Sequence, residues 1–144
     1  MSMNQVFLLA LLIALWGASP VVTGRSTVTV RLTNYLPHNL NATIHCKSKD
    51  NDLGEHVLPV YSKYEFSFKP NIFGTTLFFC GITWRDASIE YEIYSYKRDH
   101  AYRCATECNW LIKEEALICL SQDDAGQPNL IVPWKTKAHA NTSI

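Results

Sequence analysis

The stretch STVTVRLTN, residues 26–34, alternates between polar and apolar side chains. Val28, Val30 and Leu32 fall on one face of an extended chain, and threonines and an arginine fall on the other. A period of two is typical of a strand with one face against a core and the other in water. The sequence therefore predicts a half-buried β-strand here.

The same alternation returns along the chain. In residues 40–47 apolar and polar side chains alternate, which places Cys46 on the inward face. Residues 89–96 alternate in the same way, which places Tyr94 on the outward face. Residues 75–84 are apolar on both faces, which predicts a central strand. Other predicted strands are 56–60, 62–70, 109–114, 116–121 and 130–134.

Turn-forming residues separate these segments about every 8 to 12 residues, and no long stretch has a helical period. Residues 48–55 are polar and predict a solvated turn. This combination predicts an all-β fold, an antiparallel β-sandwich of about eight short strands stabilised by disulfides. Much of its core is expected from aromatic side chains: Phe66, Phe68, Phe78, Phe79, Trp84 and Trp110.

The first 24 residues contain no Lys, Arg, Asp or Glu and include the apolar run Val6–Trp16. That run is shorter than the about 20 residues that span a bilayer, and it fits the core of a signal peptide. Cleavage is predicted after Gly24, with Ser19 as second choice. Residues 25–144 then form one secreted domain that is not membrane-anchored, because no second apolar segment is long enough.

Secretion places the cysteines in an oxidising compartment, where disulfides are expected. The number is odd, so one thiol is left over, and four cysteines can pair in three ways. The cysteines are Cys46, Cys80, Cys104, Cys108 and Cys119. Two sequons, at Asn41 and Asn141, become candidate glycosylation sites.

The composition argues against several other functions. Thirteen basic and 13 acidic residues balance, so the basic field of a nucleic-acid-binding protein is missing. Asp50–Gly54 has part of a calcium-loop pattern, but Leu53 stands at a ligand position. His45 cannot activate Cys46, because neighbouring residues of a strand face opposite ways. We therefore expect no cofactor, no metal and no catalytic cysteine.

Glu90 and Glu92 form the one carboxylate pair of interest. They share a strand face about 7 Å apart, within the range of glycosidase carboxylates. With Tyr94 and Tyr96 they would form a carbohydrate-binding or hydrolytic surface. A solvated strand face explains the pair better, so this interpretation is kept as an alternative.

Several motifs together are distinctive: HCKSKDNDLGEHVL (45–58), YEFSFKPNIFGTTLFFC (64–80), Trp84, YKRD (96–99) and CNW (108–110). In order and spacing they resemble the plant self-incompatibility protein family, or S-protein homologues, over roughly residues 27–134. The resemblance implies small secreted plant β-sandwiches with disulfides. Its founding members are stigma-secreted ligands that inhibit incompatible pollen, and it does not imply an enzyme.

The chain departs from the family in its cysteines. Many members carry Gly-Pro-Cys where this chain has residues 117–119, and a cysteine where Val132 precedes the final Pro-Trp. The comparison implies that Cys119 is unpaired. It also implies that Cys46 and Cys80 are each joined to one of Cys104 and Cys108. A local Cys104–Cys108 bridge is disfavoured, because it closes a very small loop.

These features predict a secreted signal that binds a cell-surface receptor through its loops. The expected loops are 48–55, 85–88 and 97–107, whose charges give selectivity. The candidate contact residues are Lys49, Asp50, Asp52, Arg85, Asp86, Arg98 and Asp99. A defence protein that inhibits a foreign enzyme would use the same loops and is the second hypothesis. The receptor and the oligomeric state do not follow from the sequence.

Overall fold

Ten strands and a short helix follow one another in the described part of the computed structural model, which covers residues 3–5, 25–101, 103–123 and 128–136. In chain order they are β1 (Val28–Asn34), β2 (Ala42–Lys47), β3 (Asp52–Leu58), β4 (Lys63–Phe68), β5 (Leu77–Trp84), β6 (Ala87–Ser95), α2 (Tyr96–Asp99), β7 (Glu107–Ile112), β8 (Leu117–Leu120), β9 (Pro128–Val132) and β10 (Lys135–Thr136).

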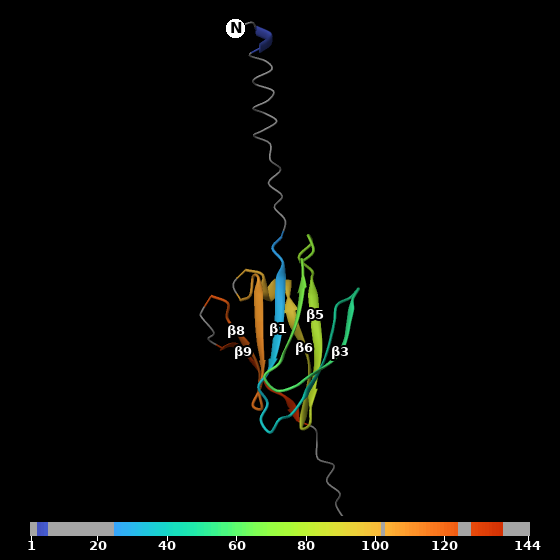
Figure 1. The fold of residues 1–144 in the computed structure, drawn as a ribbon. Coiled ribbons are helices and arrows are strands. Elements are labelled where there is room, and N and C mark those ends of the chain that lie inside the picture. The colour runs from blue at the N-terminus through green and yellow to red at the C-terminus, as the bar shows by residue number, and fades with distance from the viewer. Residues whose placement is uncertain (1–2, 6–24, 102, 124–127, 137–144) are drawn as a thin grey trace, which may run out of the picture.

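The strands form two five-stranded sheets packed face to face (Figure 1). The first sheet has the order β4-β1-β7-β8-β9, and the second has the order β10-β6-β5-β2-β3. Among the described strands, β1 pairs in parallel with β7, and the other pairings are antiparallel. The all-β sandwich expected from the sequence is confirmed, with more strands than predicted and one parallel pair.

The alternating segments fold as their pattern predicts. In β1 the apolar residues Val28, Val30 and Leu32 are buried, while the residues between them stay half-exposed. On the outer face of that sheet, Arg31 donates to Oε1 of Glu65 on β4 at 2.5 Å and to Oδ1 of Asn109 on β7 at 2.9 Å. The polar face of β1 therefore ties its two neighbouring strands together.

Two boundaries differ from the prediction. Strand β3 begins at Asp52, inside the segment 48–55 that was expected to be a turn. Gly54 lies within it at φ +78° and fits because it has no side chain to clash in the left-handed region. The predicted loop 97–107 contains most of helix α2, and its last residue begins β7. Only residues 48–51 remain as the turn between β2 and β3.

Strand β6 contains a β-bulge that reverses the predicted direction of Tyr94. Phe78 pairs with Tyr94 and Phe79 pairs with Glu92, so Ile93 is the extra residue. As a result Ile93 and Tyr94 are both fully buried. The prediction that Tyr94 is exposed was therefore wrong. Its ring packs 4.8 Å from that of Phe68, and burial raises the pKa of Tyr94 to about 12.

The disulfides join Cys46 to Cys80 and Cys104 to Cys108. Cys46 and Cys80 face each other on the paired strands β2 and β5, with a Cα–Cα distance of 4.0 Å. The expectation that each would pair with Cys104 or Cys108 was wrong, because strand register already brings the first two together. Cys119 is free and buried.

Some expectations lie outside the described residues. These are the signal-peptide core and cleavage site, within residues 6–24, and the sequon at Asn141. They remain predictions. No helix in the part of the chain that the structure describes is long and apolar enough to cross a membrane.

Candidate recognition surface

Three chain segments meet at the end of the sandwich where the chain enters β1 (Figure 1). They are the β2–β3 turn (48–51), the β4–β5 connection (69–76) and the segment from β6 to β7 (95–101 and 103–106), and we call them together the loop end. The β5–β6 turn with Arg85 and Asp86 lies at the opposite end. Two of the three predicted recognition loops are therefore brought together, and the third is separate.

Open grooves run between these segments. One of about 470 Å³ lies between Lys49 and Asp50 on one side and Lys69 and Thr75 on the other. A second of about 370 Å³ lies between Gly74 and Lys97, and a third of about 200 Å³ is lined by Tyr96 and His100. The central connection 69–76 borders all three grooves, so the loop end is one connected surface.

The turn 71–74 is held in place by its own polar groups. The Asn71 side chain accepts from the Thr75 amide at 3.0 Å and donates to the Thr75 hydroxyl at 2.8 Å. The backbone amide of Asn71 donates to the Thr76 hydroxyl at 2.7 Å. At Gly74, with φ +67°, an added Cβ would lie 2.8 Å from the Tyr96 ring. The turn thus has a fixed shape that requires glycine at this position.

The tip of this turn carries Ile72 and Phe73, which are 76% and 81% exposed. Sequence reasoning treated the segment as a simple turn and missed it. The signal was present, because two large apolar residues between Asn71 and Gly74 have no core to enter. Two adjacent large apolar side chains exposed on an ordered turn are a candidate contact surface.

Asp52 was predicted to be a recognition residue, and it makes local contacts in the structure. Its Oδ1 accepts from the Gly54 amide at 2.9 Å and lies 2.6 Å from Nε2 of His45. The Gly54 amide, and then His45, hold the pKa of Asp52 below its ordinary value. Lys49 and Asp50 are exposed beside it and are better placed for a partner.

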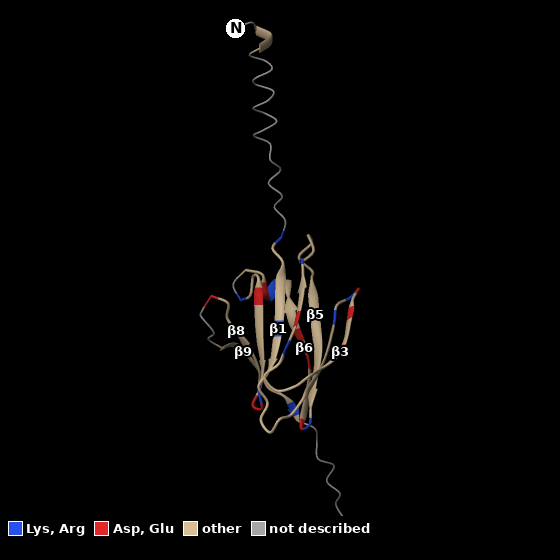
Figure 2. Ribbon diagram, viewed as in Figure 1, with Lys and Arg blue, Asp and Glu red and all other residues tan. Residues whose placement is uncertain are grey.

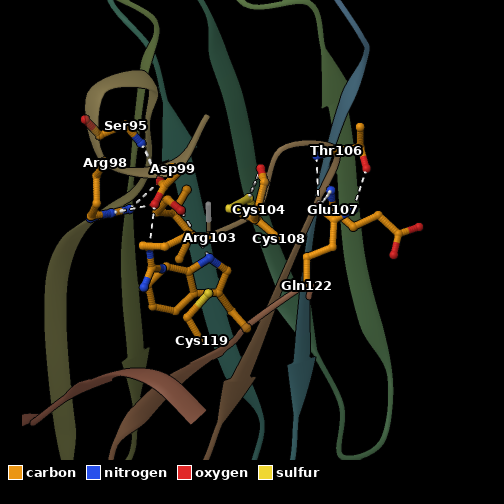
Figure 3. The surroundings of a disulfide bond; sticks show 12 residues. Ser95, Arg98, Asp99, Arg103, Cys104, Thr106, Glu107, Cys108, Cys119 and Gln122 are labelled. Carbon is orange, nitrogen blue, oxygen red and sulfur yellow. Dashed lines mark hydrogen bonds and ion pairs between the residues drawn. A yellow bond between two sulfur atoms is a disulfide. The ribbon is translucent and has the colours of Figure 1, made fainter. Parts of the chain in front are cut away.

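Asp99 has the opposite environment, because it is completely buried (Figure 3). One oxygen accepts from Nε of Arg98 and from Nε of Arg103, both at 2.8 Å. The other accepts from the Ser95 amide and from Nη2 of Arg98, also at 2.8 Å. The prediction that Asp99 contacts a partner was wrong, since it anchors helix α2 to the body of the protein. Arg98 is mostly buried with it.

Comparisons with known proteins place this chain in a family. The sequence profile described as "Plant self-incompatibility protein S1" matches residues 29–134. The chain belongs to the plant self-incompatibility protein S1 family.

Relatives in this family are similar over most of the domain. S-protein homolog 2 of Arabidopsis thaliana is 37% identical over 109 residues, which cover 74% of this chain and 67% of the relative. S-protein homolog 5 of the same plant is 40% identical over 65% of this chain and 67% of the relative. Self-incompatibility protein S1 of Papaver rhoeas is 36% identical over 67% of this chain and 70% of the relative.

A solved structure supports the fold. It has a TM-score of 0.61 and 19% sequence identity, and it covers 79% of this chain and 99% of that one. It represents SPH (Self-Incompatibility Protein Homologue) proteins, described as a widespread family of small, highly stable, secreted proteins from plants. At this identity the match shows the shared fold.

In this family member the carboxylate pair has only part of the aromatic surface that the sequence suggested. Glu90 and Glu92 are exposed on β6, beside an open groove of about 260 Å³ that includes Phe79. Tyr94 is buried by the bulge, and the Tyr96 ring stacks on His100 at 4.1 Å. Tyr94 is therefore lost from the surface of the alternative hypothesis, while Glu92 and Tyr96 both line the groove of about 370 Å³. Within the described ranges, no three His, Cys, Asp or Glu side chains gather where they could hold a metal ion.

Two of the remaining candidate sites of this family member lie away from the loop end, while Cys119 lies beside Arg103 (Figure 3). Asn41 is exposed just before β2, so its sequon is accessible. At the β5–β6 turn, Nη2 of Arg85 lies 2.6 Å from Oδ2 of Asp86, and both side chains are exposed. Cys119 is buried on β8, and burial raises its pKa to about 11. A protonated, enclosed thiol is a poor nucleophile.

Proposed function

We propose that this S1-family protein is secreted and acts as an extracellular signal that binds a cell-surface receptor through its loop end. The observation that carries the proposal is the meeting of three separate chain segments around the fixed turn 71–74. Family membership supports it, since relatives include a self-incompatibility protein and the structural relatives are described as secreted. Loops presented on a rigid scaffold are a common way to build a binding surface.

The two disulfides and the packed core hold the loops in position before binding. A surface that is already ordered loses less conformational freedom when it binds, so more of its contact energy appears as affinity. Lys49 and Asp50 are exposed at one side of the loop end, and Lys97 is exposed at another. Charges at such positions select partners and speed association.

The test exchanges charges at the loop end. Lys49→Glu combined with Asp50→Lys preserves net charge and alters no ion pair at these residues that the structure shows. We expect cell binding to fall by about tenfold. The measurement is saturation binding of fluorescent protein to pollen, stigma and root cells of the source plant. The control Arg85→Asp with Asp86→Arg makes the same kind of change at the opposite end.

Equal binding by the loop-end variant and the parent protein would contradict this assignment. Loss of binding in the control alone would move the contact to the β5–β6 turn. The cell type that binds the protein also shows whether pollen is the target. Binding through the loop end is expected on any target cell.

A further inference from the structure

Ile72 and Phe73 are adjacent in the chain, and their exposed fractions are 76% and 81%. The exposed rings of Tyr35 and Tyr61 also lie together, with centroids 6.0 Å apart, but each carries a hydroxyl and Tyr35 is only 45% exposed. Ile72 and Phe73 stand at the apex of the β4–β5 connection, where the chain projects beyond the two sheets (Figure 1). We call residues 71–74 the apolar tip.

The apolar tip is rigid, so its exposure is a property of the fold. The Arg25 guanidinium donates to the carbonyl oxygens of Asn71 and Ile72, and it stacks 4.7 Å from the centre of the Tyr96 ring. Gly74 donates its amide to the Asn71 carbonyl at 3.3 Å and rests against the same ring. The turn thus holds Ile72 and Phe73 in water, where no described part of the chain covers them.

Positive charge surrounds the apolar tip. Lys49, Lys69 and Lys97 are exposed at the loop end, and Arg25 contacts the backbone of the tip. Several basic positions are visible at this end of the ribbon (Figure 2). Asp50 and Glu92 line the same grooves as these lysines, and the exposed carboxylates of Asp52 and Glu107 stand at the starts of β3 and β7. Along the two grooves that border the tip, three lysines face two carboxylates, although the formal net charge of the whole chain is zero.

Two apolar side chains on a convex tip are too small to make a stable protein interface by themselves. Stable protein interfaces bury about 800 Å² of each partner, which needs a broad complementary surface. A bilayer interface has no such requirement, because it deforms around the inserted groups. Aromatic and aliphatic side chains enter the boundary between headgroups and acyl chains, and nearby lysines pair with anionic headgroups.

We propose that the apolar tip inserts reversibly into the surface of an anionic lipid bilayer, with Lys49, Lys69 and Lys97 on the headgroups. This is a peripheral contact of a secreted protein. It goes beyond receptor binding and does not depend on it, although it would concentrate the protein at the membrane where a receptor is found. The groups bound are the anionic headgroup and the upper acyl chain.

The test uses the full-length chain expressed in secreting cells and recovered from their medium. The probes are vesicles of phosphatidylcholine alone and of phosphatidylcholine with a minority of phosphatidylserine, separated by sedimentation. We expect binding to the anionic vesicles, little binding to neutral ones, and weakening by salt. Ile72→Ser with Phe73→Ser should reduce partitioning by about tenfold or more. Ile131→Ser, an exposed apolar residue on β9, is the matched control and should bind like the parent.

A second variant reports the position of the tip directly. Phe73→Trp should keep binding, and its added fluorescence should shift to shorter wavelength when anionic vesicles are present. The proposal is overturned if no vesicle binds, if the double serine variant binds as well as the parent, or if the tryptophan emission does not shift. If the double variant loses cell binding while no vesicle binds, the tip contacts a protein. That result overturns the lipid contact and leaves the receptor function standing.

Discussion

The segment 95–108 and the segment 48–52, which is the β2–β3 turn with the first residue of β3, both carry lysine or arginine next to aspartate, and they have opposite roles. In the first, Asp99 is buried between Arg98 and Arg103. In the second, Asp52 is exposed and contacts His45 and the Gly54 amide. The difference shows that an aspartate near basic residues holds the fold together when it is enclosed, and makes only local, solvent-exposed contacts when it faces water.

Burial also changes what each interaction contributes. A buried ion pair gains little compared with apolar packing, but removing one partner leaves an uncompensated charge. An exposed pair is screened by solvent and contributes little either way. The following experiments break or sharpen the contrast between the two segments, beginning with the largest effect.

Asp99→Ala should destabilise the protein by about 3–5 kcal/mol, because Arg98 and Arg103 lose their buried counter-charge. The measurement is the free energy of unfolding from denaturant titration. Asp50→Ala, in the exposed turn, is the control and should change it by about 0.5 kcal/mol or less. Similar values for the two variants would mean that the contrast between the segments is wrong.

The disulfides provide a second contrast. Replacing Cys46 and Cys80 by alanine opens a link with a sequence separation of 34, and replacing Cys104 and Cys108 opens one with a separation of 4. Loop-closure entropy predicts losses of about 4 and about 2 kcal/mol. Thermal unfolding of both double variants checks the order. A larger loss for the second pair would show that it anchors segment 95–108 beyond its effect on the unfolded chain.

Cys119 reports on the buried segment. Its thiol should resist labelling by a disulfide reagent at neutral pH in the folded protein, because burial raises its pKa to about 11. Labelling should follow unfolding, so Asp99→Ala should speed it by the same factor as the change in the unfolding equilibrium. Fast labelling of the parent protein would show that the region opens locally.

The smallest effect concerns Asp52 and pH. Its folded pKa is lowered, so its stabilising contribution is present above the unfolded pKa, about 4, and is lost as pH falls through the folded value. Asp52→Asn should therefore be slightly less stable than the parent at neutral pH and equal to it in strong acid. Melting temperatures measured across this range test the sign. A difference in melting temperature between the parent and Asp52→Asn that grows as the pH falls would contradict this sign.

Much of the fold could be predicted from local pattern. Alternation in β1 and β2 identified their buried faces, because one sheet face meets the core and the other meets water. The bulge in β6 could not be predicted. One extra residue moves the side chains that follow it in the strand to the opposite face of the sheet, and nothing in the composition marks its position. The parallel pairing of β1 with β7 depends on contacts far apart in sequence, which alternation does not encode.

The candidate site was predicted in part. Exposure of Lys49 and Asp50 follows from a polar turn. The burial of Asp99 does not follow, because it requires Arg98 and Arg103 to fold back over it. The disulfide pairing failed for a related reason, as it was inferred from relatives while the register of β2 against β5 was unknown. The apolar tip was missed because it has too few residues for a periodic pattern.

The place of β1 in its sheet has a consequence for how the protein is made. Val30 pairs with Phe66 and with Cys108, which follow it by 36 and 78 residues. During synthesis, β1 therefore gains its second neighbour, and this sheet is completed, only after most of the chain has been made. Long-range closure of this kind slows folding and leaves strand edges open meanwhile. A chain with this topology benefits from chaperones that hold it until its last third arrives.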